Sequence, residues 1–135
     1  MTALTEFLFP APAAERSPKA VVAWWESRRL AYNAFVGTAG TLSLFVLYFM
    51  SWLPPGPHQL EMPWIAPIVF GVAANVCYCL GPLVELLIST VFGRRVLPSG
   101  PTLYRMGLTF SVGLALLPIL ISWFDYFIRV LKFLL

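Results

Sequence analysis

The fold of this chain is decided by residues 17–53, which read SPKAVVAWWESRRLAYNAFVGTAGTLSLFVLYFMSWL. Ser17 followed by Pro18 predicts a helix start, because the serine hydroxyl can accept a backbone N–H and proline at the first helical position has none to donate. Residues 18–29 combine tryptophans with charges, whereas residues 30–53 are apolar and long enough to cross about 30 Å of hydrocarbon. The stretch therefore predicts one long helix, with an interfacial foot (18–29) leading into a first transmembrane helix (30–53).

The composition of the whole chain indicates a bilayer as its surroundings. Of its 135 residues, 59% are hydrophobic and 11% are charged, whereas about a quarter of an ordinary soluble domain is charged. The net charge is +3, but no basic run is long enough to suggest a nucleic-acid site. The length allows one domain over residues 1–135. We therefore expect a single membrane domain that contacts lipid and binds no nucleic acid.

Two further apolar stretches predict two more transmembrane helices. Residues 64–92 form the second, with a kink expected near residues 81–82 because Pro82 removes a backbone hydrogen bond. Residues 103–124 form the third. The final stretch, 125–135, is too short to cross and predicts an interfacial helix. The expected fold is all-α and polytopic, with three transmembrane helices, an amphipathic N-terminal extension and an interfacial C-terminal helix.

Aromatic and charged residues in the foot predict an anchor at the membrane interface, where a ring is half buried and a charge stays wet. Glu26 and Arg29 are three residues apart on one helix face, which favours an ion pair. A patch that binds a headgroup or a partner protein is the alternative interpretation. The predicted anchor consists of Trp24, Trp25, Glu26, Arg28 and Arg29.

The distribution of basic residues predicts the orientation, since cytoplasmic segments of membrane proteins are enriched in lysine and arginine. Basic residues precede the first span and occupy the link between the second and third spans, whereas residues 54–63 contain none. We therefore expect a cytoplasmic N-terminus and an outer C-terminus. The residues on the predicted cytoplasmic side are Arg16, Lys19, Arg28, Arg29, Arg94, Arg95 and Arg105.

A carboxylate within the second span, Glu85, predicts a polar cluster. An unpaired acidic residue costs about 2.5–3.5 kcal/mol at the centre of a span and less near its edge. We expect Glu85 to lie at the depth of Tyr32 and Asn33, to accept a hydrogen bond from one of them and to pair with an arginine. The cluster is either a clasp between helices or a functional site, namely a proton or ion relay or a headgroup site. Its predicted members are Glu85, Asn33, Tyr32, Arg94, Arg95 and Arg105.

Small residues on two spans predict close helix packing, because they let backbones approach one another in a membrane. The first span carries Gly37, Gly40 and Thr41, and the third carries Gly107 and Ser111. We expect these faces to meet other spans of the same chain, with self-association as the alternative.

The two cysteines, Cys77 and Cys79, are two residues apart on the second span. They point about 200° away from each other on a helix, so they can neither bridge nor share a metal ion. We expect both to be small buried residues.

The pattern W-E-x-R-R-x-x-Y-N occurs within residues Trp24 to Asn33, where the foot meets the first span. This pattern resembles the start of the first span in small, uncharacterised bacterial inner-membrane proteins. The match covers about ten residues of the chain. The resemblance implies a bacterial plasma membrane and transfers no catalytic residue.

The sequence contains no motif of a known enzyme class. Its only histidine is His58, so no Ser/His/Asp or Cys/His set can form, and no metal-ligand cluster or phosphate loop is present. We therefore expect no catalytic residue, no metal and no cofactor. The leading hypothesis is an accessory or assembly subunit that binds other membrane proteins or itself. The alternatives are an oligomeric transporter or channel subunit using Glu85 and Asn75, and a protein that binds lipid headgroups.

Overall fold

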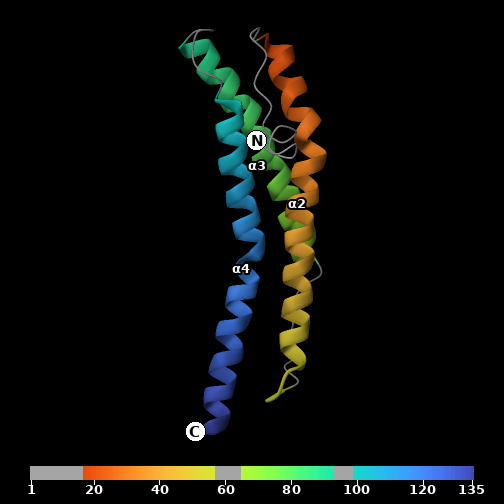
Figure 1. Cartoon of the computed structure of the whole chain (residues 1–135), viewed down its shortest axis with the longest axis vertical. Coiled ribbons are helices and arrows are strands. Elements are labelled where there is room, and N and C mark those ends of the chain that lie inside the picture. Colours follow the sequence, from red (N-terminus) through yellow and green to blue (C-terminus); the bar gives the residue numbers. More distant parts are fainter. Residues whose placement is uncertain (1–16, 57–64, 93–98) are drawn as a thin grey trace, which may run out of the picture.

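The computed structural model describes residues 17–56, 65–92 and 99–135. These residues form helices that are each long and apolar enough to cross a membrane (Figure 1). The helices are α2 (Pro18–Trp52), α3 (Ile65–Val91) and α4 (Gly100–Leu134). The predicted all-α fold with three candidate membrane spans is confirmed.

Helix α2 begins and ends where its local chemistry predicts. The Ser17 hydroxyl accepts a hydrogen bond from the Ala20 backbone N–H at 3.2 Å, and Pro18 occupies the first turn. The helix stops before Leu53, which is extended because a residue that precedes proline is disfavoured in the helical region. The foot and the first span therefore form one continuous helix, as predicted.

The other two helices differ slightly from their predicted limits. Helix α3 ends within one residue of the predicted range at each end and contains Pro82 in its interior. Helix α4 starts at Gly100 instead of residue 103, because Pro101 is compatible with a first helical turn. The stretch predicted as an interfacial helix is helical and continues α4 without a break.

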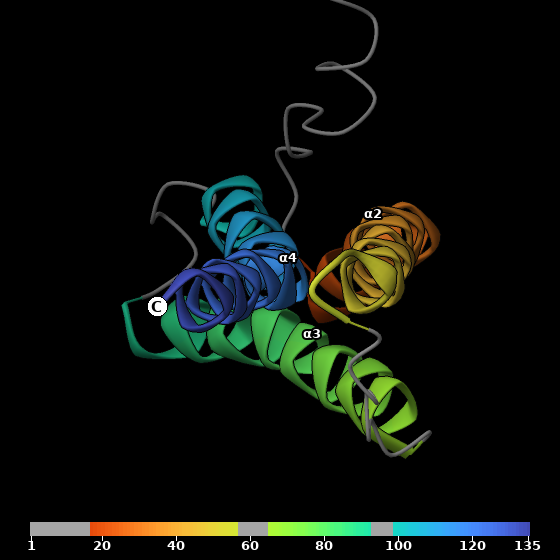
Figure 2. The same ribbon diagram turned by 90° about the horizontal axis from the view of Figure 1, so that it is seen from below.

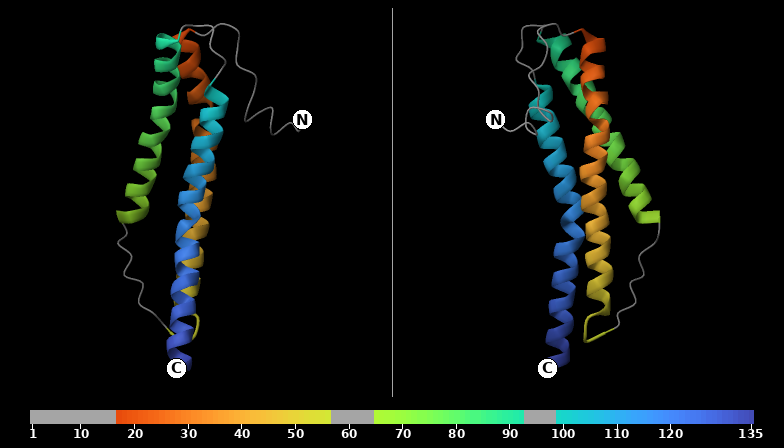
Figure 3. Two further views of the ribbon diagram at one scale, coloured as in Figure 1. Left: turned by 90° about the vertical axis from the view of Figure 1, so that its left-hand side faces the viewer. Right: turned by 45° about the vertical axis from the view of Figure 1, so that its right-hand side comes forward.

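The helices are packed unevenly along their length. Helix α4 lies beside α2 over most of the molecule, whereas α3 crosses them at an angle, contacts both through residues 74–85 and diverges from them toward its N-terminal end (Figure 2, Figure 3). The core therefore lies near the start of α2. Its buried hydrophobic residues are Val21, Trp25, Tyr32, Val36, Ala74, Tyr78 and Tyr104.

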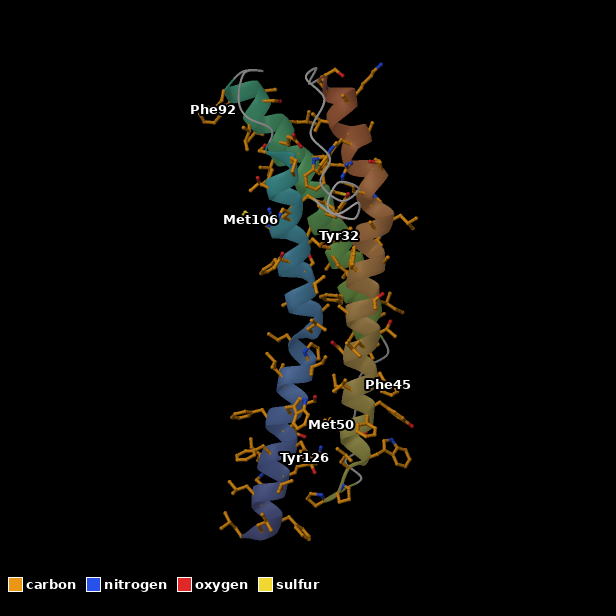
Figure 4. All side chains as sticks on the ribbon, in the orientation of Figure 1. Tyr32, Phe45, Met50, Phe92, Met106 and Tyr126 are labelled. Atoms are coloured by element: carbon orange, nitrogen blue, oxygen red, sulfur yellow. The ribbon has the colours of Figure 1, made fainter. Side chains whose placement is uncertain are left out.

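The outer surface of the bundle is largely apolar. Phe45 and Met106 point away from the helices, whereas Tyr32 lies between them (Figure 4). Exposed apolar surface on this scale suits hydrocarbon better than water.

The cysteines belong to this outer surface, so the expectation that they are buried is wrong. Cys77 and Cys79 are both exposed and neither is in a disulfide. They flank Tyr78, one of the residues of α3 that point inward, and residues adjacent to an inward-facing residue point sideways on a helix.

Candidate functional site

The contact between α2 and α3 is formed by their inward faces. On each helix the inward residues recur every three or four positions, which places them on one stripe. On α2 the stripe consists of Val21, Trp25, Arg28, Tyr32 and Val36. On α3 it consists of Ala74, Tyr78, Gly81 and Glu85, of which Gly81 is half-buried and the others buried.

Trp25 is the central contact between α2 and α3. Its indole Nε1 donates a hydrogen bond to Glu85 Oε2 at 2.7 Å, and its backbone carbonyl accepts one from the Tyr78 hydroxyl at 2.5 Å. Only 3% of Trp25 is exposed. Trp25 therefore does not face lipid headgroups, as the predicted anchor would require, but joins two helices.

Glu85 is buried against α2 and α4. Its exposed fraction is 6%, and a Cβ atom added to Gly100 would lie 2.6 Å from its Oε2, so the start of α4 approaches the carboxyl group closely. A buried carboxyl group that loses its hydrogen bond costs about 1–3 kcal/mol. Glu85 therefore joins α2 to α3, with Trp25 as the donor in place of the predicted Asn33 or Tyr32.

The predicted partners of Glu85 lie elsewhere. The Tyr32 hydroxyl contacts the Ala74 carbonyl at 3.1 Å and the Ser111 hydroxyl at 2.7 Å, so it joins all three helices at another level. Tyr32 is two turns along α2 from Trp25, about 10 Å deeper. The prediction that Glu85 shares its depth with Tyr32 and Asn33 is therefore wrong, because Glu85 aligns with the foot.

The arginines predicted to pair with Glu85 are placed as follows. Arg94 and Arg95 lie outside the described residues, and Arg105 is exposed on α4. The ion pairs formed within residues 17–56, 65–92 and 99–135 are Glu26–Arg29 at 2.6 Å and Asp125–Arg129 at 3.0 Å. The predicted pair of Glu26 with Arg29 is thus confirmed, and neither pair includes Glu85.

Five rings form an aromatic cluster around the Trp25–Glu85 contact. Trp25 meets Tyr78 and Tyr104 edge-on, with ring centroids 5.4 Å and 6.0 Å apart. Such pairs contribute about 0.5–1.5 kcal/mol beyond their buried area. The members of the aromatic cluster are Trp24, Trp25, Tyr32, Tyr78 and Tyr104.

Arg28 closes the aromatic cluster on one side. It is 8% exposed, its guanidinium carbon lies 3.9 Å from the centroid of the Trp24 ring, and its Nη1 donates to the Trp24 carbonyl at 2.7 Å. Arg28 is therefore buried on aromatic surface, whereas Glu26 is exposed.

Several residues of this site were not predicted. Tyr78 and Tyr104 bring aromatic hydroxyls into otherwise apolar spans, and that polarity is the signal that could have identified them. Gly81 was interpreted only as part of a kink, yet a Cβ there would overlap the Trp25 ring. Gly100 was not among the predicted site residues, although its missing side chain makes room for Glu85.

A groove of about 500 Å³ opens where α3 diverges from α2 and α4. A Cβ added to Gly37 or Gly40 would meet nothing within 4 Å, so the prediction that these glycines pack against other spans of the chain is wrong for the described residues. Ser111 does pack as predicted, whereas Gly107 is exposed. The small-residue groove is lined in part by Asn33, Gly37, Gly40, Thr41, Gly71 and Asn75.

Comparison of the chain with protein-family models, curated proteins and solved structures finds no match.

Proposed function

We propose that this protein is a non-catalytic accessory or assembly subunit of a membrane, which binds a helix of a neighbouring membrane protein in the small-residue groove. The observation that carries the proposal is the open space above Gly37 and Gly40. Small residues in a membrane helix allow a second helix backbone to approach closely, and no described part of this chain fills that position.

The surroundings of Glu85 favour an assembly role over an ion or proton relay. Glu85 is enclosed and hydrogen-bonded to Trp25, and Asn75 lies ten residues away on α3, about 15 Å along the helix. The enclosed position of Glu85 and its distance from Asn75 support a rigid end of the bundle rather than a path for a solute.

The proposed location is the plasma membrane of a bacterium, with the N-terminus in the cytoplasm and the C-terminus on the outer face. The resemblance of residues 24–33 to bacterial inner-membrane proteins supports the membrane. The basic residues at the start of α2 and in the link between α3 and α4 support the orientation.

The experiment places a photo-crosslinking amino acid at Thr41 in intact membranes. Thr41 lines the groove, whereas Leu42, which points about 100° away on the helix and is 50% exposed, does not and serves as the control position. We expect a discrete protein adduct from Thr41 and none from Leu42.

A second comparison uses variants whose larger side chains fill the groove. Leucines at Gly37 and Gly40 have room in the groove, so the double variant G37L/G40L should fold and lose the Thr41 adduct. Gly113 is equally open and does not line the groove, so G113L should keep the adduct. An adduct with lipid alone, or one that persists in G37L/G40L, would contradict the proposal.

A further inference from the structure

Two amide side chains face the small-residue groove from opposite helices. Asn33 belongs to α2 and Asn75 to α3, and both line it. The residues that precede them, Tyr32 and Ala74, are joined by a hydrogen bond of 3.1 Å. The two amides therefore lie at adjoining levels of the bundle.

Both amides retain hydrogen-bonding capacity. Asn75 donates its Nδ2 to the Gly71 carbonyl at 3.1 Å, which leaves its Oδ1 available. No hydrogen bond joins the Asn33 amide to any residue that the structure describes. By contrast, the hydroxyls of Thr41 and Ser43 in the same groove already donate to the carbonyls of Gly37 and Ala115.

The groove selects against an ionic occupant. Among the residues that the structure describes, its lining contains no acidic or basic residue, so these residues offer no counter-charge to a phosphate headgroup, a lysine or an aspartate. A bare acyl chain would leave the Asn33 amide and the Asn75 Oδ1 without partners, which is unfavourable in apolar surroundings. A helix with an uncharged side chain that can both donate and accept a hydrogen bond needs no counter-charge and provides partners for the amides.

We propose that the helix bound in the groove carries one uncharged polar side chain, of the Asn, Gln, Ser or Thr type, that hydrogen-bonds to Asn33 and Asn75. This inference rests on the proposed function and names the chemistry of the partner at that site. Hydrogen bonds between membrane helices provide selectivity in addition to the van der Waals packing of small residues.

The test measures binding of synthetic transmembrane peptides to the full-length protein in phosphatidylcholine vesicles. The host peptide is a Leu/Ala helix with one Gly-x-x-x-Gly pair and an acceptor dye excited by the tryptophans of the protein. One peptide series carries Gln at each of four successive positions, and the reference peptide carries Leu. We expect one Gln position to bind roughly threefold or more tightly than Leu, given the strength of interhelical hydrogen bonds.

Variants of the protein test whether the amides of Asn33 and Asn75 cause the preference for the Gln peptide. The double variant N33A/N75A should bind all peptides alike, and T41V should retain the preference because the Thr41 hydroxyl is already bonded within α2. Retained binding of the Leu peptide by N33A/N75A shows that the variant is folded. Equal binding of the Gln and Leu peptides by the natural protein, or a preference that survives in N33A/N75A, would overturn the inference. Neither result affects the Thr41 adduct, which tests the proposed function separately.

Discussion

At the residue scale, the contact between the Trp25 indole and the Glu85 carboxylate organises one end of the molecule. From the sequence, Glu85 could be expected to need a partner within the membrane, but the partner could not be identified. Which residue of α2 reaches Glu85 depends on the register of α2 against α3, and hydropathy does not determine that register. A tryptophan next to arginines is compatible with a lipid-facing position as well as with a buried one, so the role of Trp25 emerged only from the structure.

Replacing Trp25 with Phe should lower the free energy of unfolding by about 1–3 kcal/mol, since Glu85 would lose its donor while staying buried. The measurement is reversible unfolding in mixed detergent micelles. Trp24→Phe is the matched control, because the Trp24 Nε1 has no hydrogen-bond partner among the described residues. Equal destabilisation by the two variants would contradict the assignment of Trp25 as the donor that stabilises Glu85.

The glycines of α3 permit a second test at this scale. Gly81→Ala should destabilise the protein by about 1–3 kcal/mol, because the added methyl group overlaps the Trp25 ring and forces it to move. Gly71→Ala lies on the same helix and meets nothing within 4 Å, so it should be neutral or stabilising by up to about 1 kcal/mol. The same unfolding assay distinguishes the two variants. An unchanged free energy of unfolding in Gly81→Ala would show that α2 and α3 do not approach each other this closely.

At the element scale, cap chemistry and hydropathy were sufficient to locate the helices. Ser17-Pro18 and the prolines after Leu53 delimit α2, and the apolar stretches delimit α3 and α4 to within a few residues. The continuation of α4 beyond residue 124 could not be predicted, because a separate interfacial helix would have the same pattern. In the structure this last part is attached to α2 through Arg129, whose Nη2 donates to the Met50 carbonyl at 2.9 Å.

This contact places a cation at the C-terminal end of α2, which has no basic residue in its own last turn. A positive charge there is favourable because the helix carbonyls point toward it. Arg129→Ala should therefore speed hydrogen exchange in the last turn of α2 by roughly 2- to 10-fold, since a hydrogen bond contributes about 0.5–1.5 kcal/mol. Mass spectrometry of the protein in lipid nanodiscs measures the exchange.

Lys132 provides the control for this prediction. It is exposed near the end of α4, so Lys132→Ala removes a charge of the same sign without removing the contact to Met50. Similar exchange in both variants would indicate a general effect of charge and would exclude a specific role for Arg129.

At the scale of the whole molecule, the bundle is tightly joined at the start of α2 and open further along it. Small residues predicted close approach of helices, and Ser111 fulfils that prediction. They could not predict that α3 would diverge and leave Gly37 and Gly40 without a neighbour among the described residues, since the divergence depends on how α3 is tilted by its contacts with Trp25. The small-residue groove is therefore a property of the assembled helices and not of any one of them.

The central claim is that three helices cross a membrane with their arginine-rich ends in the cytoplasm. Labelling of single cysteines by a membrane-impermeant maleimide in intact cells tests it most directly, with Cys77 and Cys79 replaced by serine. Gly56 follows α2 and Ser99 precedes α4, at opposite ends of the bundle. We predict that Gly56→Cys is labelled from outside and that Ser99→Cys is labelled only after lysis. Labelling of Ser99→Cys alone in intact cells, or recovery of the protein in the aqueous fraction, would contradict the account.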